Sequence, residues 1–447
     1  MTLGSTARKT LLFIGDVVAL YAALFATLII RYGKGFYSQF TGFHATPFTI
    51  IFACWILIFY IAGLYDLRRL RNNLDFLKIL SLTLFVNAIL AILFFYLIPT
   101  FGITPKTNLF LTTAIFACLE LYWRRAFNRA IGTSEAPNKV LLVGDSKTAG
   151  SVRAYVAATP QLGYEIKAHI SEDAAHAAPE AIEKNVRANG ITLVVVPYEM
   201  KHDPTLTKVL YHLLGSGIEV RDLDNFYELV LGKVPLEEVE EIWFLENITE
   251  QHKFYDDLKR ASEIIFALAL AVILSPILLI LAILVKLTSR GPVIFKQVRV
   301  GQNNRSFTLY KFRSMRANAE AAGAQWKASG TRDPRLTPIG SILVASHIDE
   351  LLQLFNILKG EMSFVGPRPE RPEFVKLLQE KIQHYNIRHL VKPGIAGWAQ
   401  INYRYGASVE DAYEKLEYDI YYVKNRSIFI DVAIVLKTVK AFFVNQK

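Results

Sequence analysis

Cysteine and acidic residues are both scarce in this sequence. Only Cys54 and Cys118 occur among 447 residues, and each lies inside an apolar run. Two such thiols exclude a disulfide framework and a thiolate metal site, so we expect the soluble parts to face a reducing cytoplasm. The 40 acidic residues are outnumbered by 50 basic ones, which gives a formal net charge of +10. This excess is typical of proteins that bind nucleic acid, or of proteins that bind anionic lipids and phosphates.

Charge is also rare in several long stretches, and this favours lipid and phosphate over nucleic acid. Hydrophobic residues make up 52% of the chain. The apolar runs at residues 11–30, 48–64 and 79–98 are long enough to cross a bilayer. A fourth run, at residues 108–123, is shorter and carries Glu120. We count it as a span because the distribution of basic residues requires an even number of spans.

The basic residues beside these runs predict the topology. Nine of them lie before the first run, between the second and third, or after the fourth: Arg8, Lys9, Arg68, Arg69, Arg71, Lys78, Arg124, Arg125 and Arg129. The two intervening loops hold three: Arg31, Lys34 and Lys106. Because basic loops stay inside, residues 1–134 are predicted to form a transmembrane four-helix bundle with both ends on the inner side. For Asp16 and Asn87, within the spans, we favour hydrogen bonding between helices over a functional role.

Residues 135–250 are predicted to form a Rossmann-like α/β domain. Apolar strands at residues 139–144, 191–196 and 218–221 alternate with helical stretches, which indicates a parallel sheet. A dinucleotide fingerprint after the first strand would place glycine at positions 144, 146 and 149. The sequence has Gly144, Ser146 and Ala149 there. We therefore favour a role in assembly or regulation over dinucleotide binding.

A fifth apolar block, residues 264–285, contains 22 residues without a charge. Ser275 and Pro276 lie at its centre, where proline removes a helix hydrogen bond and forces a kink. Both flanks are basic, whereas a spanning helix should have one less basic flank. The length of the block would also allow a full crossing of the bilayer, but the pattern favours a re-entrant membrane helix, which enters, breaks at this pair and returns. Residues 251–447, which include this helix, are predicted to form a C-terminal α/β catalytic domain.

The last domain is rich in motifs that fit phosphoryl transfer. Residues 346–360 are predicted to be a helix that carries Asp349 and Glu350 in its first turn and ends at Gly360. Prolines on both sides of Arg368 fix the backbone and present a rigid guanidinium, which suits a phosphate. Further candidates for substrate binding are Lys311, Arg313, Arg335, Gln400 and Asp419. Together they supply carboxylates for Mg²⁺ and cations for a diphosphate beside a membrane helix.

At these residues the sequence resembles the bacterial sugar transferase family, the monotopic phosphoglycosyl transferases. The resemblance covers roughly residues 259–447, and the upstream bundle and α/β domain resemble its large subgroup. It implies transfer of a hexose-1-phosphate from a UDP-hexose to undecaprenyl phosphate, with release of UMP, at the bacterial inner membrane. This reaction initiates exopolysaccharide, capsule or O-antigen synthesis. The resemblance further implies that Asp349 is the nucleophile and a Mg²⁺ ligand, that Glu350 helps to place the metal, and that Arg368 binds phosphate.

One departure from the family pattern keeps two alternatives open. Family members commonly carry basic residues shortly before the Asp-Glu pair, whereas residues 343–347 here read Leu-Val-Ala-Ser-His. A phosphate or nucleotide contact is then either absent or supplied elsewhere, for example by Arg335 or Arg371. The alternatives are direct transfer with Asp349 as a metal ligand only, and an inactive membrane scaffold that recruits polysaccharide machinery. A bundle joined to an α/β domain is also compatible with a homodimer.

Overall fold

The computed structural model describes the chain except for residues 1–4, 66–73, 98–105, 135–137, 160–161, 249–252, 317–318, 320–334, 404–405, 407 and 445–447. Arg68, Arg69 and Arg71, on which the predicted topology partly rests, lie outside the described residues. The chain divides into two compact units, Met1–Phe226 and Tyr227–Lys447. Each unit is a mixture of elements with its own core, and each is described by itself below.

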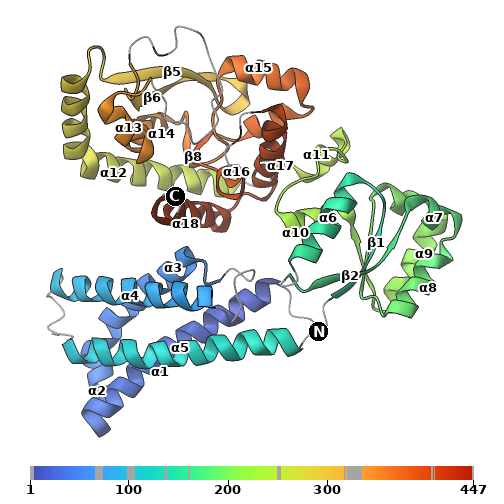
Figure 1. Ribbon diagram of the computed structural model, residues 1–447, viewed down its shortest axis with the longest axis horizontal. Helices are drawn as coiled ribbons and strands as arrows, with labels where there is room; N and C mark the ends of the chain where they lie inside the picture. Colours follow the sequence, from blue (N-terminus) through green and yellow to red (C-terminus); the bar gives the residue numbers. More distant parts are fainter. Residues whose placement is uncertain are drawn as a thin grey trace. The chain divides into compact units, whose positions relative to one another are not determined.

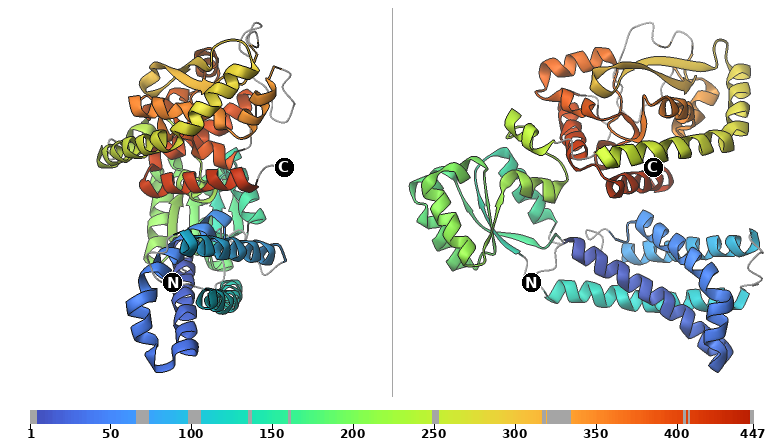
Figure 2. Two further views of the ribbon diagram at one scale, coloured as in Figure 1. Left: turned by 90° about the vertical axis from the view of Figure 1, so that its left-hand side faces the viewer. Right: turned by 180° about the vertical axis from the view of Figure 1, so that it is seen from behind.

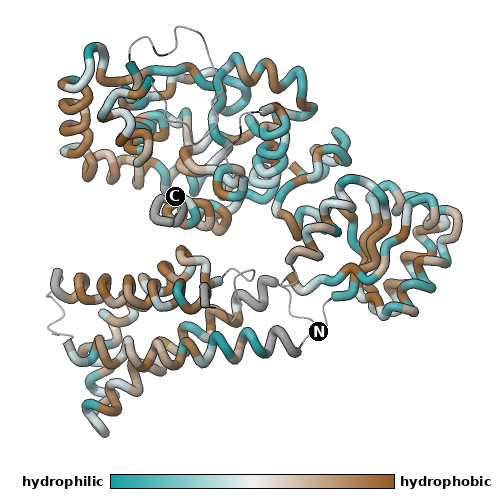
Figure 3. The backbone as a smooth tube through the Cα atoms, in the orientation of Figure 1, coloured by the Kyte–Doolittle hydropathy of each residue, from teal (hydrophilic) through white to brown (hydrophobic). Residues whose placement is uncertain are grey.

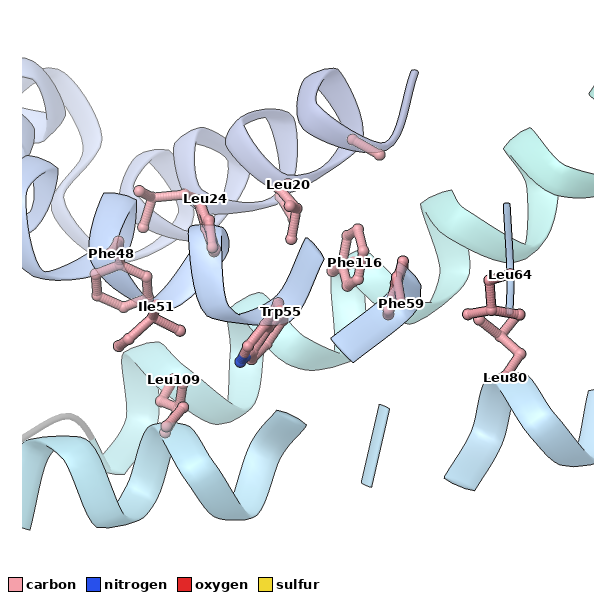
Figure 4. Close-up of a cluster of buried hydrophobic side chains, with 14 of the residues drawn as sticks. Leu20, Leu24, Phe48, Ile51, Trp55, Phe59, Leu64, Leu80, Leu109 and Phe116 are labelled. Atoms are coloured by element: carbon pink, nitrogen blue, oxygen red, sulfur yellow. The ribbon is translucent and has the colours of Figure 1, made fainter. Parts of the chain in front are cut away.

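The first unit begins with four long helices around a common apolar core (Figures 1 and 2). They are α1 (Ser5–Tyr32), α3 (Ala45–Ala62), α4 (Leu74–Leu97) and α5 (Lys106–Ser134), with the short η1 (Gly33–Gly35), α2 (Phe36–Gln39) and η2 (Phe40–His44) between α1 and α3. Buried side chains from these helices meet in Figure 4, among them Leu20, Leu24, Trp55 and Phe116. Tyr21 Oη lies 2.9 Å from Thr49 Oγ1. These two residues are 28 positions apart in the sequence, so the chain must turn back between them, and α1 and α3 lie side by side as a hairpin.

Length and composition identify three candidate membrane spans among the described residues: Thr10–Ala62, Phe76–Phe95 and Lys253–Thr288. A helix pair bent by 78°, Pro338–Ala345 with Ile348–Lys359, would make a fourth. The first stretch holds both α1 and α3. Helix α5 does not pass the same test, because its second half is charged. The count of four spans in the first unit therefore stays a prediction, although four long helices do share the core.

Polar groups within the bundle contact neighbouring helices, as expected for Asp16 and Asn87. Arg124 Nη2 donates to Asp16 Oδ2 at 2.5 Å, and Arg124 Nε donates to Glu120 Oε1 at 2.6 Å. All three side chains are fully buried. Asn87 Nδ2 donates to the carbonyl oxygen of Trp55 at 3.5 Å, and Trp55 Nε1 donates to that of Asn87 at 2.9 Å. The contacts of Asp16 and Asn87 thus join different helices, as expected, whereas Arg124 and Glu120 both lie in α5.

The remainder of the first unit is a parallel sheet, as predicted. Its strands are β1 (Asn138–Val143), β2 (Tyr164–Ile170), β3 (Leu193–Val196) and β4 (Glu219–Asp222), in the order β2-β1-β3-β4. Around it lie α6 (Lys147–Ala158), α7 (Glu172–Ala177), α8 (Glu180–Asn189), η6 (Glu199–His202) and α9 (Pro204–Gly215). Strand β2 escaped prediction because it is an edge strand with several polar, partly exposed residues. Ser146, at the second fingerprint position, caps α6 by accepting a hydrogen bond from Ala149 N at 3.2 Å.

The second unit is built from short sheets and helices. Its strands form an antiparallel pair, β5 (Ile294–Val300) and β6 (Ser306–Phe312), and a parallel pair, β7 (Ser363–Val365) and β8 (Gly394–Ala396). Its α-helices are the end of α10 (Leu223–Leu231), α11 (Glu241–Asn247), α12 (Lys253–Thr288), α13 (Pro338–Ala345), α14 (Gln353–Lys359), α15 (Pro372–Lys381), α16 (Trp398–Asn402), α17 (Val409–Asn425) and α18 (Ile428–Val444). The unit also contains the 3-10 turns η7 (Gln302–Asn304), η8 (Ile348–Leu352) and η9 (Tyr385–Leu390). Val234, Leu236 and Phe244 are buried against α15 and α17. The unit therefore includes residues upstream of the predicted domain limit at residue 250.

Helix α12 carries the Ser275-Pro276 pair and is bent. Its ribbon turns a corner in Figure 1, and Figure 3 shows that most of its length is hydrophobic. Only 6% of its most apolar window is buried. Ala267, in the first half, packs in a cluster with Leu309 and Leu354, whereas Val285, in the second half, packs with Phe312 and Leu343. Both halves thus rest on the same unit, and the outer surface of the helix is apolar and exposed.

Candidate active site

The segment that carries Asp349 and Glu350 follows a sharp break between two helices. Helix α13 ends at Ala345, and His347 adopts a left-handed conformation with φ of +55°. The next five residues form the 3-10 turn η8, which leads directly into α14. Both carboxylates lie in the first turn after the break, as predicted, although the α-helix proper starts at Gln353. Gly360 ends α14 with φ of +83°, as expected for a glycine stop.

Glu350 is held by two of the predicted cations. Lys311 Nζ, on β6, donates to Glu350 Oε1 at 2.7 Å, and Arg368 Nη2 donates to the same oxygen at 3.1 Å. The side chain of Glu350 is 11% exposed. Burial opposes its ionisation, but Arg368 and Lys311 outweigh burial and lower the pKa of Glu350 to about 2. Glu350 is therefore a permanent anion that fixes two cations beside its neighbour.

Asp349 has the opposite electrostatic environment. Burial raises its pKa, and the negative charge of Glu350 adds to this effect, while Lys311 and His347 partly oppose it. The carboxylate of Asp349 is thus less stabilised as an anion than that of Glu350. Adjacent carboxyl groups whose environments push their pKa values apart are a common feature of catalytic sites. This difference is compatible with the predicted reactive role of Asp349 and supporting role of Glu350, which stay predictions.

The other predicted substrate-binding residues contact different parts of the unit. Arg313 Nη2 donates to the carbonyl oxygen of Ser289 at 2.7 Å, and Gln400 Nε2 donates to that of Ile395 at 3.2 Å. Asp419 is buried and lies 2.8 Å from Arg388 Nη2. Arg335 Nη1 donates to the carbonyl oxygen of Ala319 at 3.4 Å. The structure therefore groups Lys311, Glu350 and Arg368 with Asp349. Substrate contacts by Arg313, Arg335, Gln400 and Asp419 stay predictions.

Sequence reasoning overlooked two residues. His347 lies beside Asp349 and lowers its pKa, although it belongs to the stretch described above as lacking basic residues. A histidine counts as a cation once it is protonated, and that signal was available in the sequence. Arg388 has no motif around it that would mark it, and only the structure shows its contacts.

The carboxylates fit Mg²⁺ only with help from a substrate. Among the described residues, no group of three His, Cys, Asp or Glu side chains is placed to hold a metal ion. Lys311 and Arg368 both donate to Oε1 of Glu350, so Asp349 is the carboxylate that we expect to bind the metal ion. Mg²⁺ in phosphoryl-transfer sites is usually held by one or two carboxylates together with substrate phosphates and water. Asp349 matches this arrangement, and the metal stays a prediction.

The part of the chain that carries the candidate active site is similar to known proteins. Residues 254–445 match the model of the family described as bacterial sugar transferase. The chain is 42% identical over 265 residues to the UDP-N-acetylgalactosamine-undecaprenyl-phosphate N-acetylgalactosaminephosphotransferase of Aeromonas hydrophila, which covers 55% of this chain and 62% of that protein. It is 32% identical over 305 residues to the UDP-glucose:undecaprenyl-phosphate glucose-1-phosphate transferase of Escherichia coli (strain K12), which covers 64% of each.

A shorter relative is covered almost completely. The chain is 41% identical over 188 residues to the exopolysaccharide production protein PSS of Rhizobium leguminosarum bv. phaseoli, which covers 42% of this chain and 93% of that protein. The matches to the two longer relatives span less than two thirds of their length.

Proposed function

This chain belongs to the bacterial sugar transferase family, and we propose that it moves a hexose-1-phosphate from a UDP-hexose to undecaprenyl phosphate, with release of UMP. The observation that carries this proposal is the pairing of Glu350 with Lys311 and Arg368 next to Asp349. Two relatives named as transferases to undecaprenyl phosphate support the acceptor. Initiation of exopolysaccharide, capsule or O-antigen synthesis is the corresponding role.

The proposed reaction has two steps at one phosphorus atom. A carboxylate oxygen of Asp349 attacks the β-phosphorus of the UDP-hexose, and the bond to the bridging oxygen of UMP breaks. UMP leaves with the electron pair of that bond, and the sugar phosphate stays on Asp349. A phosphate oxygen of undecaprenyl phosphate then attacks the same phosphorus and frees the Asp349 carboxylate. The product is undecaprenyl diphosphate hexose, so each step forms and breaks one phosphorus–oxygen bond.

The surrounding cations make attack by a carboxylate on an anionic diphosphate reasonable. Arg368 is the most accessible member of the group, with 33% of its side chain exposed, compared with 18% for Lys311. Its fork of donors suits phosphate oxygens. Lys311 is more deeply buried, and burial lowers its pKa despite the nearby Glu350. Mg²⁺, when bound through Asp349, would supply further neutralisation of phosphate charge.

The membrane topology is part of the proposal. We place the protein in the bacterial inner membrane, with the catalytic unit on the cytoplasmic side and α12 as a re-entrant helix. A straight α12 of 36 residues would measure about 54 Å. Instead, Arg260 near its start donates to the carbonyl oxygen of Ile357, and Ser289 at its end accepts from Arg313. Contact of both ends with the same unit supports entry and return through one face of the bilayer.

UMP release from a panel of UDP-sugars tests the function. Full-length protein in lipid nanodiscs, with a short polyprenyl phosphate and Mg²⁺, should release UMP with at least one UDP-hexose. Asp349→Asn should lower turnover at least ~10³-fold, by analogy with loss of a catalytic nucleophile. Glu380→Gln, at an exposed carboxylate of α15, is the matched control and should keep wild-type activity.

Labelling separates the proposed mechanism from its alternatives. A UDP-hexose labelled in the β-phosphate and added without lipid should label the wild-type protein and leave Asp349→Asn unlabelled. An active enzyme that gives sequential kinetics and no labelled protein would make Asp349 a metal ligand in a direct transfer. Absence of UMP release with every UDP-sugar, from folded protein, would favour the membrane scaffold.

A further inference from the structure

The loop that carries Arg368 is held through its backbone oxygens. Four consecutive carbonyl groups each accept a hydrogen bond of 2.9 Å from another segment: Pro367 from Gly394 N, Arg368 from Arg388 Nη2, Pro369 from Arg299 Nη1 and Glu370 from Val300 N. Two of these donors are guanidinium groups. Anchoring through the main chain leaves the side chain of Arg368 to face Glu350. The aim of that side chain therefore depends on what holds the loop.

Arg388 is the more deeply buried of the two guanidinium anchors. It lies in η9 and is 6% exposed. Its Nη1 donates to Tyr385 Oη at 2.8 Å, and its Nε donates to Asp419 Oδ2 at 2.9 Å. Its Nη2 lies 2.8 Å from the same Asp419 oxygen and donates to the carbonyl oxygen of Arg368. All three nitrogens are engaged, so the plane of the guanidinium has one orientation.

A gain in stability is a weak explanation for this buried pair. Apolar side chains of similar volume often replace a buried ion pair without loss of stability, because desolvation offsets the attraction between the charges. Asp419 supplies the counter-charge that lets Arg388 remain ionised inside the unit. Burial would lower the pKa of Arg388, but Tyr385, Asp419 and Glu370 outweigh burial and raise it. What the ionised guanidinium adds beyond the pair is its donor to the Arg368 loop.

We propose that Arg388 and Asp419 are positioning residues, which act on the phosphate of the sugar donor only through Arg368. Asp419 orients Arg388, Arg388 fixes the backbone at Arg368, and Arg368 presents its guanidinium beside Glu350. This inference rests on the proposed function, because it assigns the purpose of the chain of contacts to a phosphate. It also replaces the predicted substrate contact of Asp419 with an indirect role.

A double-mutant cycle on donor binding tests the proposal. Asp349→Asn protein in nanodiscs serves as the background, so that the affinity for the UDP-hexose is measurable without turnover. Arg388→Lys keeps the charge and loses the fork, and it should weaken binding about 10-fold or more, since small misplacements of a binding group have large effects. When Arg368→Ala is also present, the same change should cost less than about 2-fold, because coupled residues are not additive.

Milder and matched variants keep the test informative if Arg388→Lys folds poorly. Tyr385→Phe removes only the partner of Nη1, and it should weaken binding about 3-fold, an effect that disappears with Arg368→Ala. Glu417→Gln breaks another buried pair on the same helix, with Lys233, and is the control. Glu417→Gln and Asp419→Asn should both lower the melting temperature, but Glu417→Gln should leave the affinity for the UDP-hexose unchanged.

The outcomes distinguish this proposal from the proposed function. Losses that are equally large with and without Arg368→Ala would overturn the positioning role, while UMP release by the wild type would leave the function intact. An unchanged affinity in Arg388→Lys and Tyr385→Phe would overturn it as well. If the wild type neither binds nor turns over any UDP-sugar, both proposals fail together.

Discussion

Asp349→Asn should abolish turnover and Glu350→Gln should impair it strongly, but the two replacements should change stability in opposite directions. The cations beside Glu350 lower its pKa from 4.5 to about 2, and a shift of this size corresponds to about 3 kcal/mol in favour of the folded, ionised form. Because the folded-state pKa is depressed, this stabilisation is present above pH 4.5 and is lost as the pH falls towards 2. Glu350→Gln removes it at every pH.

For Asp349, ionisation has the opposite effect on the stability of the fold. Its pKa is raised in the folded state, mainly by burial, so its ionised form opposes folding at neutral pH. Stability is therefore lost as the pH rises through the folded-state pKa of this group. Asp349→Asn should relieve that cost and melt at or above the wild-type temperature. The advantage should disappear in acid, where Asp349 is protonated in both states. A catalytic group held at a cost to stability is a known compromise.

Thermal unfolding of full-length protein in nanodiscs measures both effects. For a unit of 221 residues, Tyr227–Lys447, a loss of about 3 kcal/mol lowers the melting temperature by roughly 6–12 °C. Tryptophan fluorescence at pH 7 reports unfolding, since Trp398 lies in this unit. Glu380→Gln is again the control. If Glu350→Gln melts at or above the wild-type temperature, or Asp349→Asn melts several degrees below the control, the assigned electrostatics are wrong.

Three further predictions concern the membrane and the domain limits. Pro276→Leu should straighten α12 and let a cysteine at position 290 react with a membrane-impermeant reagent outside spheroplasts, in a background without native cysteines; labelling with Pro276 intact would refute re-entry. Arg124→Leu leaves buried carboxyl groups without their counter-ion and should destabilise the fold by roughly 3–5 kcal/mol. An immunoblot of membranes should therefore show less protein, and unchanged accumulation would contradict a structural role of Arg124. A chain starting at residue 227 should release UMP faster than one starting at residue 250, which lacks buried core side chains; equal rates would show that these are dispensable.

The sequence predicted elements whose signal is local. The parallel strands β1 and β3 follow from short apolar runs, and the stop at Gly360 follows from the ease with which glycine adopts a left-handed conformation. Strand β2 was missed because its pattern comes from an exposed sheet edge. The break at His347 was missed because non-glycine residues seldom adopt positive φ.

Within the site, residue types were predictable and partnerships were not. Lys311 and Arg368 are distant in the sequence from Glu350. The packing of β6 brings Lys311 to Glu350, and the loop after β7 brings Arg368 to it. Asp419 illustrates the limit of the same reasoning. The sequence suggested a substrate contact for Asp419, which stays a prediction, but it did not suggest the ion pair of Asp419 with Arg388. The sequence spacing carries no information about which carboxylate faces the ligand and which faces a structural cation.

The membrane helix and the reactive group depend on one another through the polar start of α12. Arg260 donates to the carbonyl oxygens of Ile357 and Leu358, at the end of the helix that follows Glu350. Lys259 Nζ donates to the carbonyl oxygen of Val365 at 2.8 Å, three residues before Arg368. Both segments of the site are therefore fastened to the helix that is expected to enter the bilayer. If the acceptor is a lipid phosphate, as proposed, fixing the site to that helix sets Asp349 and Arg368 at one depth relative to the acceptor.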